Sequence, residues 1–230
     1  MKEPGERSPA LVAQVLGVEH WSLLATRGAI WQEIFSRTAT FLTILSATMV
    51  ALSLVVQASG FGPTFRIVAL VVLPLLLFIG LATFARLVEA DVEDAWLVIG
   101  MNRLRHAYVE LAPEIEQYLV TGRYDDEAGM LQTYGFRPRI GVTHLFAGSP
   151  IIIGIVDALI SGVLVTIVGQ TLGAPTWAQV IAGAGVAISV AVLLCSVFVK
   201  RVSRFFRDLQ PRFPAPSIND SQSREDDNAV

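Results

Sequence analysis

The strongest constraint on this chain is a set of four apolar tracts, each about 20 residues long and nearly free of charge. They occupy residues 38–58, 67–85, 151–170 and 177–199, and Asp157 is the one charged residue within them. A bilayer core about 30 Å thick needs about 20 residues of helix. Because lipid offers the backbone no hydrogen-bond partner, each tract is expected to be helical. The predicted fold class is all-α: a polytopic membrane protein with four transmembrane helices and a helical cytoplasmic loop.

The composition agrees with a lipid solvent. Charged residues make up 16% of the chain, against about 25% in soluble domains, and hydrophobic residues make up 53%. The net charge of −3 gives no support for nucleic-acid binding. The N-terminal residues lack the apolar core and cleavage site of a signal peptide, so the first span is expected to direct insertion.

The placement of Lys and Arg predicts the orientation. Sixteen of the 17 basic residues precede the first span, follow the last one or lie in the central loop, and Arg66 alone lies in a short connection. Basic residues collect on the cytoplasmic side, so the termini and the central loop are expected there. Most of these residues are Arg, a bias common in GC-rich bacteria, and the expected location is a bacterial inner membrane.

The spans divide the chain into five segments. We expect a cytoplasmic N-terminal amphipathic helical segment, a first transmembrane hairpin, a cytoplasmic helical loop, a second transmembrane hairpin, and a basic juxtamembrane helix with a disordered tail. Their predicted bounds are 1–37, 38–87, 88–150, 151–199 and 200–230. Each hairpin closes with a Gly- and Pro-containing turn, which is typical either of a duplicated hairpin or of any tight outer turn.

Local signals refine this plan. Ser8 and Pro9 predict the start of a first N-terminal helix, and a second stretch, 19–37, leads into the first span. That stretch suits a helix at the lipid headgroups or one that packs on the central loop. The second span is expected to continue as a helix to near Ala112, before Pro113. From Pro211 onward the composition predicts disorder.

Asp157 is the first candidate for function, because an ionisable residue within a span is costly. It could line a proton or cation path, or pair with Thr43, Ser46 or Thr48 of another helix. It also lies only two turns from the start of its span, where water and the helix N-terminus would favour a carboxylate.

Small residues recur at every fourth position in the last two spans, which allows close approach between membrane helices. The candidate packing positions are Gly154, Ala158, Gly162, Gly185 and Ser189. Packing within one chain would explain them, and so would a homo-oligomer.

Two charged segments flank the spans. Four cations next to the last span are candidates for contact with anionic lipids, or reflect topology alone: Lys200, Arg201, Arg204 and Arg207. The run Asp125-Asp126-Glu127 is either a solvated helical face or a site for a metal or basic partner, although it lacks the ligand spacing of a calcium loop.

The sequence holds no Gly-rich phosphate loop, nucleophile elbow or paired metal-ligand motif. We therefore predict no catalytic residue, no cofactor and no metal site. A single Cys195 excludes a disulfide within the chain.

The stretch 20–42, HWSLLATRGAIWQEIFSRTATFL, resembles a segment of small uncharacterised four-pass membrane proteins of actinobacterial type. It covers about a tenth of the chain and implies no activity. The layout of an N-terminal helix, a two-span hairpin and a cytoplasmic helix also resembles the SLATT class of bacterial membrane effectors. That resemblance implies oligomerisation into pores, although two further spans follow here and no nucleotide-sensing domain is attached.

Three hypotheses for function follow. The first is a non-enzymatic, homo-oligomeric channel-like or scaffold protein of the inner membrane. The second is a small transporter, or a transporter accessory subunit, that uses Asp157. The third and least supported is a membrane enzyme, which would require a bound cofactor or metal.

Overall fold

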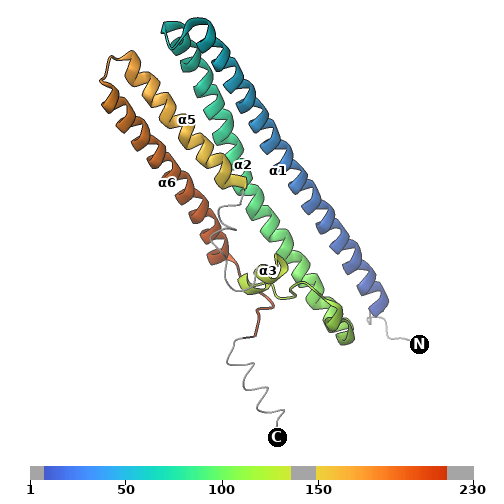
Figure 1. Ribbon diagram of the computed structural model, residues 1–230. Helices are drawn as coiled ribbons and strands as arrows, with labels where there is room; N and C mark the ends of the chain where they lie inside the picture. The colour runs from blue at the N-terminus through green and yellow to red at the C-terminus, as the bar shows by residue number, and fades with distance from the viewer. Residues whose placement is uncertain (1–7, 136–148, 217–230) are drawn as a thin grey trace, which may run out of the picture. The chain divides into compact units, whose positions relative to one another are not determined.

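The computed structural model describes residues 8–135 and 149–216, and all regular structure in these ranges is helical (Figure 1). The prediction about a signal peptide falls partly on residues 1–7, which lie outside the described ranges. The helices are α1 (Pro9–Ser59), α2 (Pro63–Leu111), the 3₁₀ helix η1 (Pro113–Tyr118), α3 (Glu127–Thr133), α5 (Ser149–Thr171) and α6 (Thr176–Asp208). Helices α1, α2, α5 and α6 are each long and apolar enough to cross a membrane. The structure therefore supports a multi-pass, all-helical membrane protein.

The long helices run past the ends of the predicted spans. The two separate N-terminal helices that the sequence predicts are instead the beginning of α1, which also contains the first span. No proline interrupts α1 after Pro9, so each further residue adds a hydrogen bond at little cost. Helix α2 continues to Leu111 and ends before Pro113, as predicted.

The chain forms two compact units. One contains the described residues of Met1–Ile30, Glu93–Ile140 and Phe205–Val230, and the other those of Trp31–Val92 and Gly141–Arg204. The second unit holds the four predicted spans, so we call it the span unit. We call the other the extension unit.

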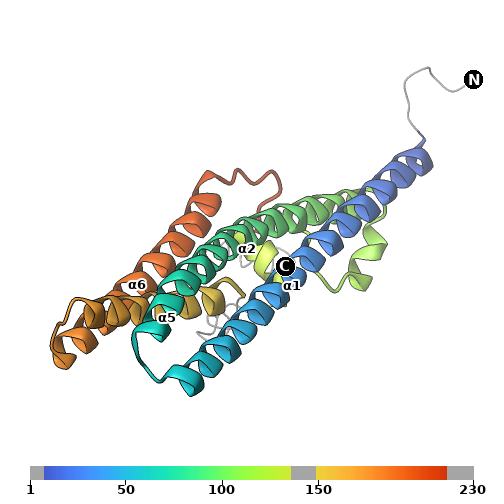
Figure 2. The same ribbon diagram turned by 90° about the horizontal axis from the view of Figure 1, so that it is seen from above.

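The span unit consists of two helical hairpins, with α2 and α5 as neighbours (Figure 1). The turn of each hairpin contains a glycine with positive φ, Gly60 at 62° and Gly173 at 73°, a conformation that residues with a Cβ rarely adopt. Figure 2 shows both turns at the same end of this unit. Of the four long helices, α5 has the largest buried fraction, and its Ile153 is 0% exposed.

The extension unit is built on the second half of α2. The first turns of α1 pack on it, with the rings of His20 and Tyr108 stacked at 5.8 Å and the Tyr108 hydroxyl donating to the Leu16 carbonyl at 3.0 Å. The end of α6 contacts the same helix through Phe205, whose ring meets Trp96 edge-on at 5.2 Å. Of the two predicted roles of the N-terminal helix, the structure shows packing against the central segment.

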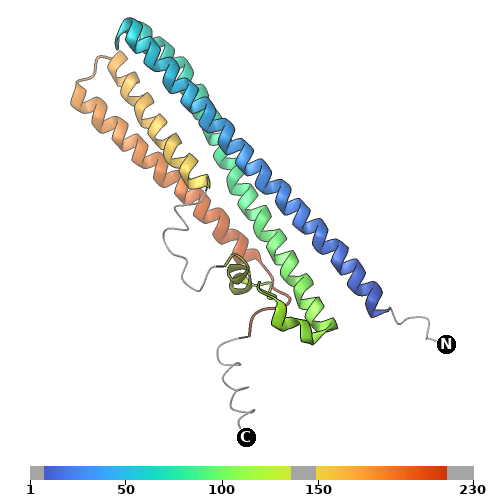
Figure 3. The ribbon, with the colours of Figure 1, turned by 45° about the vertical axis from the view of Figure 1, so that its right-hand side comes forward.

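The residues after α6 are not disordered throughout. Residues 211–216 lie beside α3 (Figure 3), and the Asp125 N–H donates to the Phe213 carbonyl at 3.2 Å. The prediction of disorder from Pro211 is therefore wrong for these residues, because backbone hydrogen bonds and ring packing compensate for their polar composition. Residues 217–230 lie outside the described ranges.

Candidate functional site

Asp157 lies on the side of α5 that packs against α2. Its side chain faces Gly80, and a Cβ at that glycine would lie 2.7 Å from the Asp157 Cγ and closer still to Oδ1. The residue is 0% exposed. Neither Oδ1 nor Oδ2 has a hydrogen-bond partner among the described residues. A buried carboxyl group with no donor is unusual, because most buried polar atoms find a partner.

The hydroxyl groups of α1 do not pair with Asp157. Thr43 and Ser46 each donate to a carbonyl of their own helix, at 2.8 Å. Thr48 lines an apolar cavity of about 400 Å³ between α1, α2 and α5. The proposed pairing is therefore wrong: Asp157 faces the second span, and the absence of a Cβ at Gly80 makes room for it.

The predicted packing positions divide into two groups. On α5, Ala158 is buried and Gly154 approaches Phe84, which would lie 3.3 Å from an added Cβ. Gly162 approaches α6, because an added Cβ would lie 2.7 Å from the Gly183 carbonyl oxygen. All three positions of α5 therefore lie at helix contacts.

The α6 positions are different. Nothing lies within 4 Å of a Cβ added at Gly185, and Ser189 is exposed and donates to the Gly185 carbonyl at 2.7 Å. The row that meets α5 passes through Gly183 and Ala187 instead. Both rows consist of small residues, so spacing alone does not distinguish the packed face from the exposed one.

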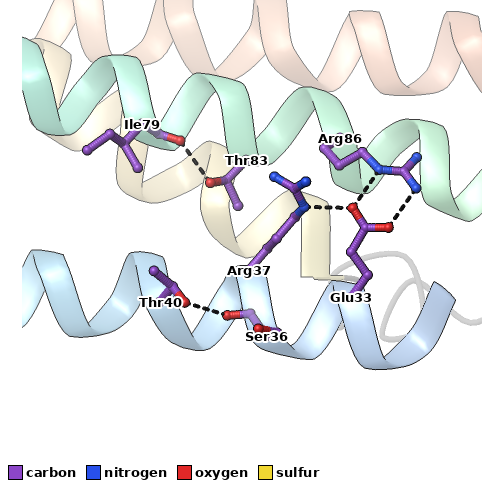
Figure 4. Close-up of polar contacts among 7 residues, drawn as sticks. All are labelled: Glu33, Ser36, Arg37, Thr40, Ile79, Thr83 and Arg86. Atoms are coloured by element: carbon purple, nitrogen blue, oxygen red, sulfur yellow. Dashed lines mark hydrogen bonds and ion pairs between the residues drawn. The ribbon is translucent and has the colours of Figure 1, made fainter. Parts of the chain in front are cut away.

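A charged cluster joins α1 and α2 just outside their predicted spans (Figure 4). Arg86 donates to both Glu33 oxygens, at 3.0 and 2.9 Å, and Arg37 donates to Oε1 at 2.7 Å. Hydrogen bonds from Arg86 and then from Arg37 lower the Glu33 pKa to about 2. Thr83 and Thr40, in the adjoining ends of the two spans, donate their hydroxyl hydrogens to carbonyls of their own helices and not to Glu33.

The four cations proposed for lipid contact are all exposed. Arg201 also donates to Glu89 at 2.6 Å, and this hydrogen bond raises the Arg201 pKa. One of the four is thus partly neutralised within the chain.

The acidic run holds the segment that follows α6. Asp125 is 0% exposed and accepts from Arg103 Nε at 2.7 Å, and from the Arg212 and Phe213 N–H groups at 2.9 and 2.7 Å. Burial acts to raise the Asp125 pKa, but these donors outweigh it and lower the pKa below its ordinary value.

Asp126 adds a second anchor. Its side chain accepts from the Gly129 N–H at the start of α3 and from the Ala215 N–H, both at 2.8 Å. We call this arrangement, Asp125 and Asp126 with residues 212–215, the tail clamp. The reading of the acidic run as a solvated face is therefore wrong for Asp125. No three His, Cys, Asp or Glu residues of the described ranges lie close enough together to hold a metal ion.

A second polar cluster of the extension unit was not apparent from the sequence. Arg27 Nε donates to Asp94 Oδ1 at 2.7 Å, and the Tyr134 hydroxyl donates to Oδ2 of the same carboxylate. The Arg27 guanidinium also lies over the Tyr134 ring, 5.5 Å from its centroid. Because these three residues are far apart along the chain, no spacing rule could have grouped them.

Comparison with known proteins adds no assignment. No family model, no curated protein and no solved structure matches this chain.

Proposed function

We propose that this chain is a non-enzymatic protein of a bacterial inner membrane that assembles into a homo-oligomer with a channel-like or scaffolding role. The observation that carries the proposal is the exposed face of α1 within the first span. Opposite the fully buried Phe41, this face carries several hydroxyl groups, together with the exposed side chains of Val50 and Leu54. Its exposed hydroxyl-bearing residues are Thr40, Thr43, Ser46 and Ser53, and we call it the hydroxyl face.

The exposed face of α6 provides the contrast. There Ile181, Ile188 and Val192 are 60 to 66% exposed, which suits contact with lipid tails. On the hydroxyl face each hydroxyl bonds to a carbonyl of its own helix, as Thr43 does to Ala39 at 2.8 Å. Small hydroxyl residues are enriched where membrane helices meet each other or meet water. We infer that the hydroxyl faces of several copies meet around a hydrophilic path.

Orientation and lipid contact belong to the same proposal. The termini and the extension unit lie in the cytoplasm, on the side favoured by the basic residues. Lys200, Arg204 and Arg207 are exposed and contact anionic headgroups there, whereas Arg201 is shared with Glu89. Native mass spectrometry with anionic and zwitterionic lipids tests this part, since equal retention of the two would contradict it.

The oligomer is tested in two ways. The full chain, purified in mild detergent, is expected to have a mass several times that of one copy, and a strict monomer would end the proposal. In a Cys195→Ser background, Thr43→Cys is expected to form disulfide-linked dimers under oxidation. Val192→Cys is the matched control on the lipid-facing side of α6 and is expected to stay monomeric. Equal cross-linking at the two positions would show that the hydroxyl face is not the contact between copies.

The channel is tested by solute flux. Reconstituted wild-type chain is expected to release a trapped small ion from liposomes, and Thr43→Leu is expected to reduce that release by closing the path with apolar bulk. If neither the wild-type oligomer nor the Thr43→Leu oligomer releases the ion, the channel is rejected and the scaffolding role remains. A cofactor or metal that co-purifies with the chain would contradict the non-enzymatic assignment.

A small transporter, or a transporter accessory subunit, is the second candidate. Asp157 favours it, because a buried carboxyl group without a donor is a costly feature to retain inside a span. Asp157→Asn is expected to abolish coupled ion or solute flux, and unchanged flux would reject the transporter.

A further inference from the structure

We propose that Asp157 is a proton-binding site: it is neutral while α5 packs on α2 at Gly80, and it releases its proton only when that contact opens. The inference concerns the contact between two helices of one chain. It does not depend on the oligomer proposed above.

The site is shaped for a carboxyl group. Of the two glycines of α2, Gly80 is the one at which an added Cβ would collide with the Asp157 side chain, and the collision would involve Oδ1, Cγ and Oδ2 together. The absence of a side chain at Gly80 therefore creates the space that the carboxyl group fills. Asp157 is 0% exposed there, so water does not reach its oxygens while the contact is closed.

Among the described residues, no charge or donor stabilises a carboxylate in this space. The four spans hold no other Asp, Glu, Lys, Arg or His, so no such titratable group of α1, α2 or α6 faces Asp157 from within the membrane. Cys195, the one thiol, is exposed on α6. The nearest cation along α2 is Arg86, six residues from Gly80, and its guanidinium binds Glu33.

The nearby hydroxyl groups are also engaged. Ser161 donates to the Asp157 backbone carbonyl at 2.7 Å, and Thr83 donates to the Ile79 carbonyl at 2.8 Å. An ionised carboxylate with neither solvent nor donors is strongly disfavoured, whereas the neutral carboxyl group is tolerated.

The same surroundings favour a proton over a metal ion. Cations such as Ca²⁺ and Mg²⁺ take about six oxygen ligands. Among the described residues, one carboxyl group surrounded by apolar side chains and engaged hydroxyls does not provide such a shell. A proton needs a single oxygen. Asp157 binds it from water as a carboxylate and returns it to water, with no other bond made or broken.

Release of the proton has a structural consequence. The ionised group requires hydration, and water can reach it only if α5 moves away from Gly80. Asp157 lies six residues inside its predicted span, about 9 Å along the helix axis, which is within reach of water from the near side of the membrane. Protonation thus favours the closed contact and ionisation the open one.

Infrared spectroscopy of the full chain in lipid tests the protonation state. At neutral pH, the difference between wild type and Asp157→Asn is expected to contain the carbonyl stretch of a protonated carboxyl group. Isotopic labelling of aspartate with ¹³C should shift the same band in the unmodified chain, so the test holds even if the variant fails to fold. Absence of the band would overturn the proposal, and a band lost on addition of Na⁺ or Ca²⁺ would identify a metal-ion site instead.

Opening of the contact is tested by thiol accessibility in a Cys195→Ser background. Thr83→Cys places a thiol one turn from Gly80 at a position that is 7% exposed. The rate of maleimide modification is divided by the rate measured on unfolded protein at the same pH, which removes the pH dependence of the thiol itself. This corrected rate is expected to rise over the pH range in which the infrared band disappears. With Asp157→Asn added, the corrected rate should stay low at every pH. The same pH response in both chains would overturn the coupling.

Discussion

A Cβ added at Gly80 would collide with the Asp157 side chain, so the glycine of α2 makes room for the carboxyl group of α5. A glycine inside a long helix costs about 1 kcal/mol relative to alanine, so it needs a compensating role. Here the missing Cβ leaves room for a buried carboxyl group. At the scale of single residues, the second span is thus adapted to one side chain of the third.

Gly80→Ala is expected to lower the stability of the chain by about 1–3 kcal/mol, because the new methyl group would overpack the Asp157 carboxyl. In the Asp157→Ala background the same substitution should be close to neutral, since the colliding atoms are gone. Thermal unfolding in detergent measures both. Gly28→Ala is the control, because nothing lies within 4 Å of a Cβ added there. Equal losses in the two backgrounds would show that Gly80 serves another purpose.

Glu33 is the second residue whose surroundings predict a measurable effect. Glu33→Gln is expected to lower the unfolding temperature by a few degrees, because Arg86 and Arg37 lose the charge that they share. The folded pKa of about 2 lies below the ordinary 4.5, so the carboxylate stabilises the fold above pH 4.5. That contribution is lost as the pH falls toward 2.

The difference in unfolding temperature between wild type and Glu33→Gln should therefore be constant near neutrality and shrink in acid. Glu19→Gln, at an exposed position of the same helix, is the control and should change little at any pH. A difference that grew as the pH fell would contradict the pairing.

At the scale of elements, the tail clamp joins three segments that are distant in sequence. Helix α2 supplies Arg103, the two residues just before α3 supply the carboxylates, and the chain after α6 supplies backbone N–H groups. The ring of Phe213 also stacks on His106 of α2, with centroids 4.1 Å apart. The extension unit is thus closed by the residues that follow the last span.

Asp125→Ala is expected to release residues 212–215. Hydrogen bonds to charged groups contribute about 1.5–3 kcal/mol each, so the Arg212 and Phe213 amides should exchange with deuterium at least about tenfold faster. Asp208→Ala, at an exposed position near the end of α6, should leave this exchange unchanged. Because the Asp125 pKa is lowered, the clamp holds at neutral pH and is lost only as the pH falls below the ordinary 3.8. Unchanged exchange in Asp125→Ala would show that Asp125 does not hold residues 212–215 in place.

At the scale of the whole molecule, four membrane-length helices among the described residues support a multi-pass membrane protein, and the uneven distribution of basic residues predicts its orientation. An even number of spans would place both termini on one side, and the basic residues predict that this side is the cytoplasm. Nothing in the fold of the two hairpins themselves selects that side.

The orientation is tested by fusing reporters that are active on one side of the membrane. A reporter active only in the cytoplasm is expected to work when fused after Val230 or before Met1, and to fail when inserted at Gly173. An added pair of arginines next to Gly173 should weaken this preference, because it opposes the natural charge bias. Reporter activity at Gly173 in the unmodified chain would reverse the topology.

The amino-acid sequence was sufficient to predict the four spans as helices, although not that the N-terminal helices continue into α1. Lipid leaves the backbone no alternative, so uncharged tracts of membrane length predict the spans, and Pro113 predicts where α2 ends. The sequence also pointed to Asp157, because it is the one charged residue within the four apolar tracts. The tertiary structure alone decided which faces meet. Small residues occur on both sides of α6, yet Gly183 and Ala187 lie against α5 whereas a Cβ added at Gly185 would contact nothing within 4 Å. The partner of Asp157 is a glycine that no polar pattern marks. Secondary structure follows from local chemistry and solvent, whereas the choice of partner depends on shape across residues far apart in the chain.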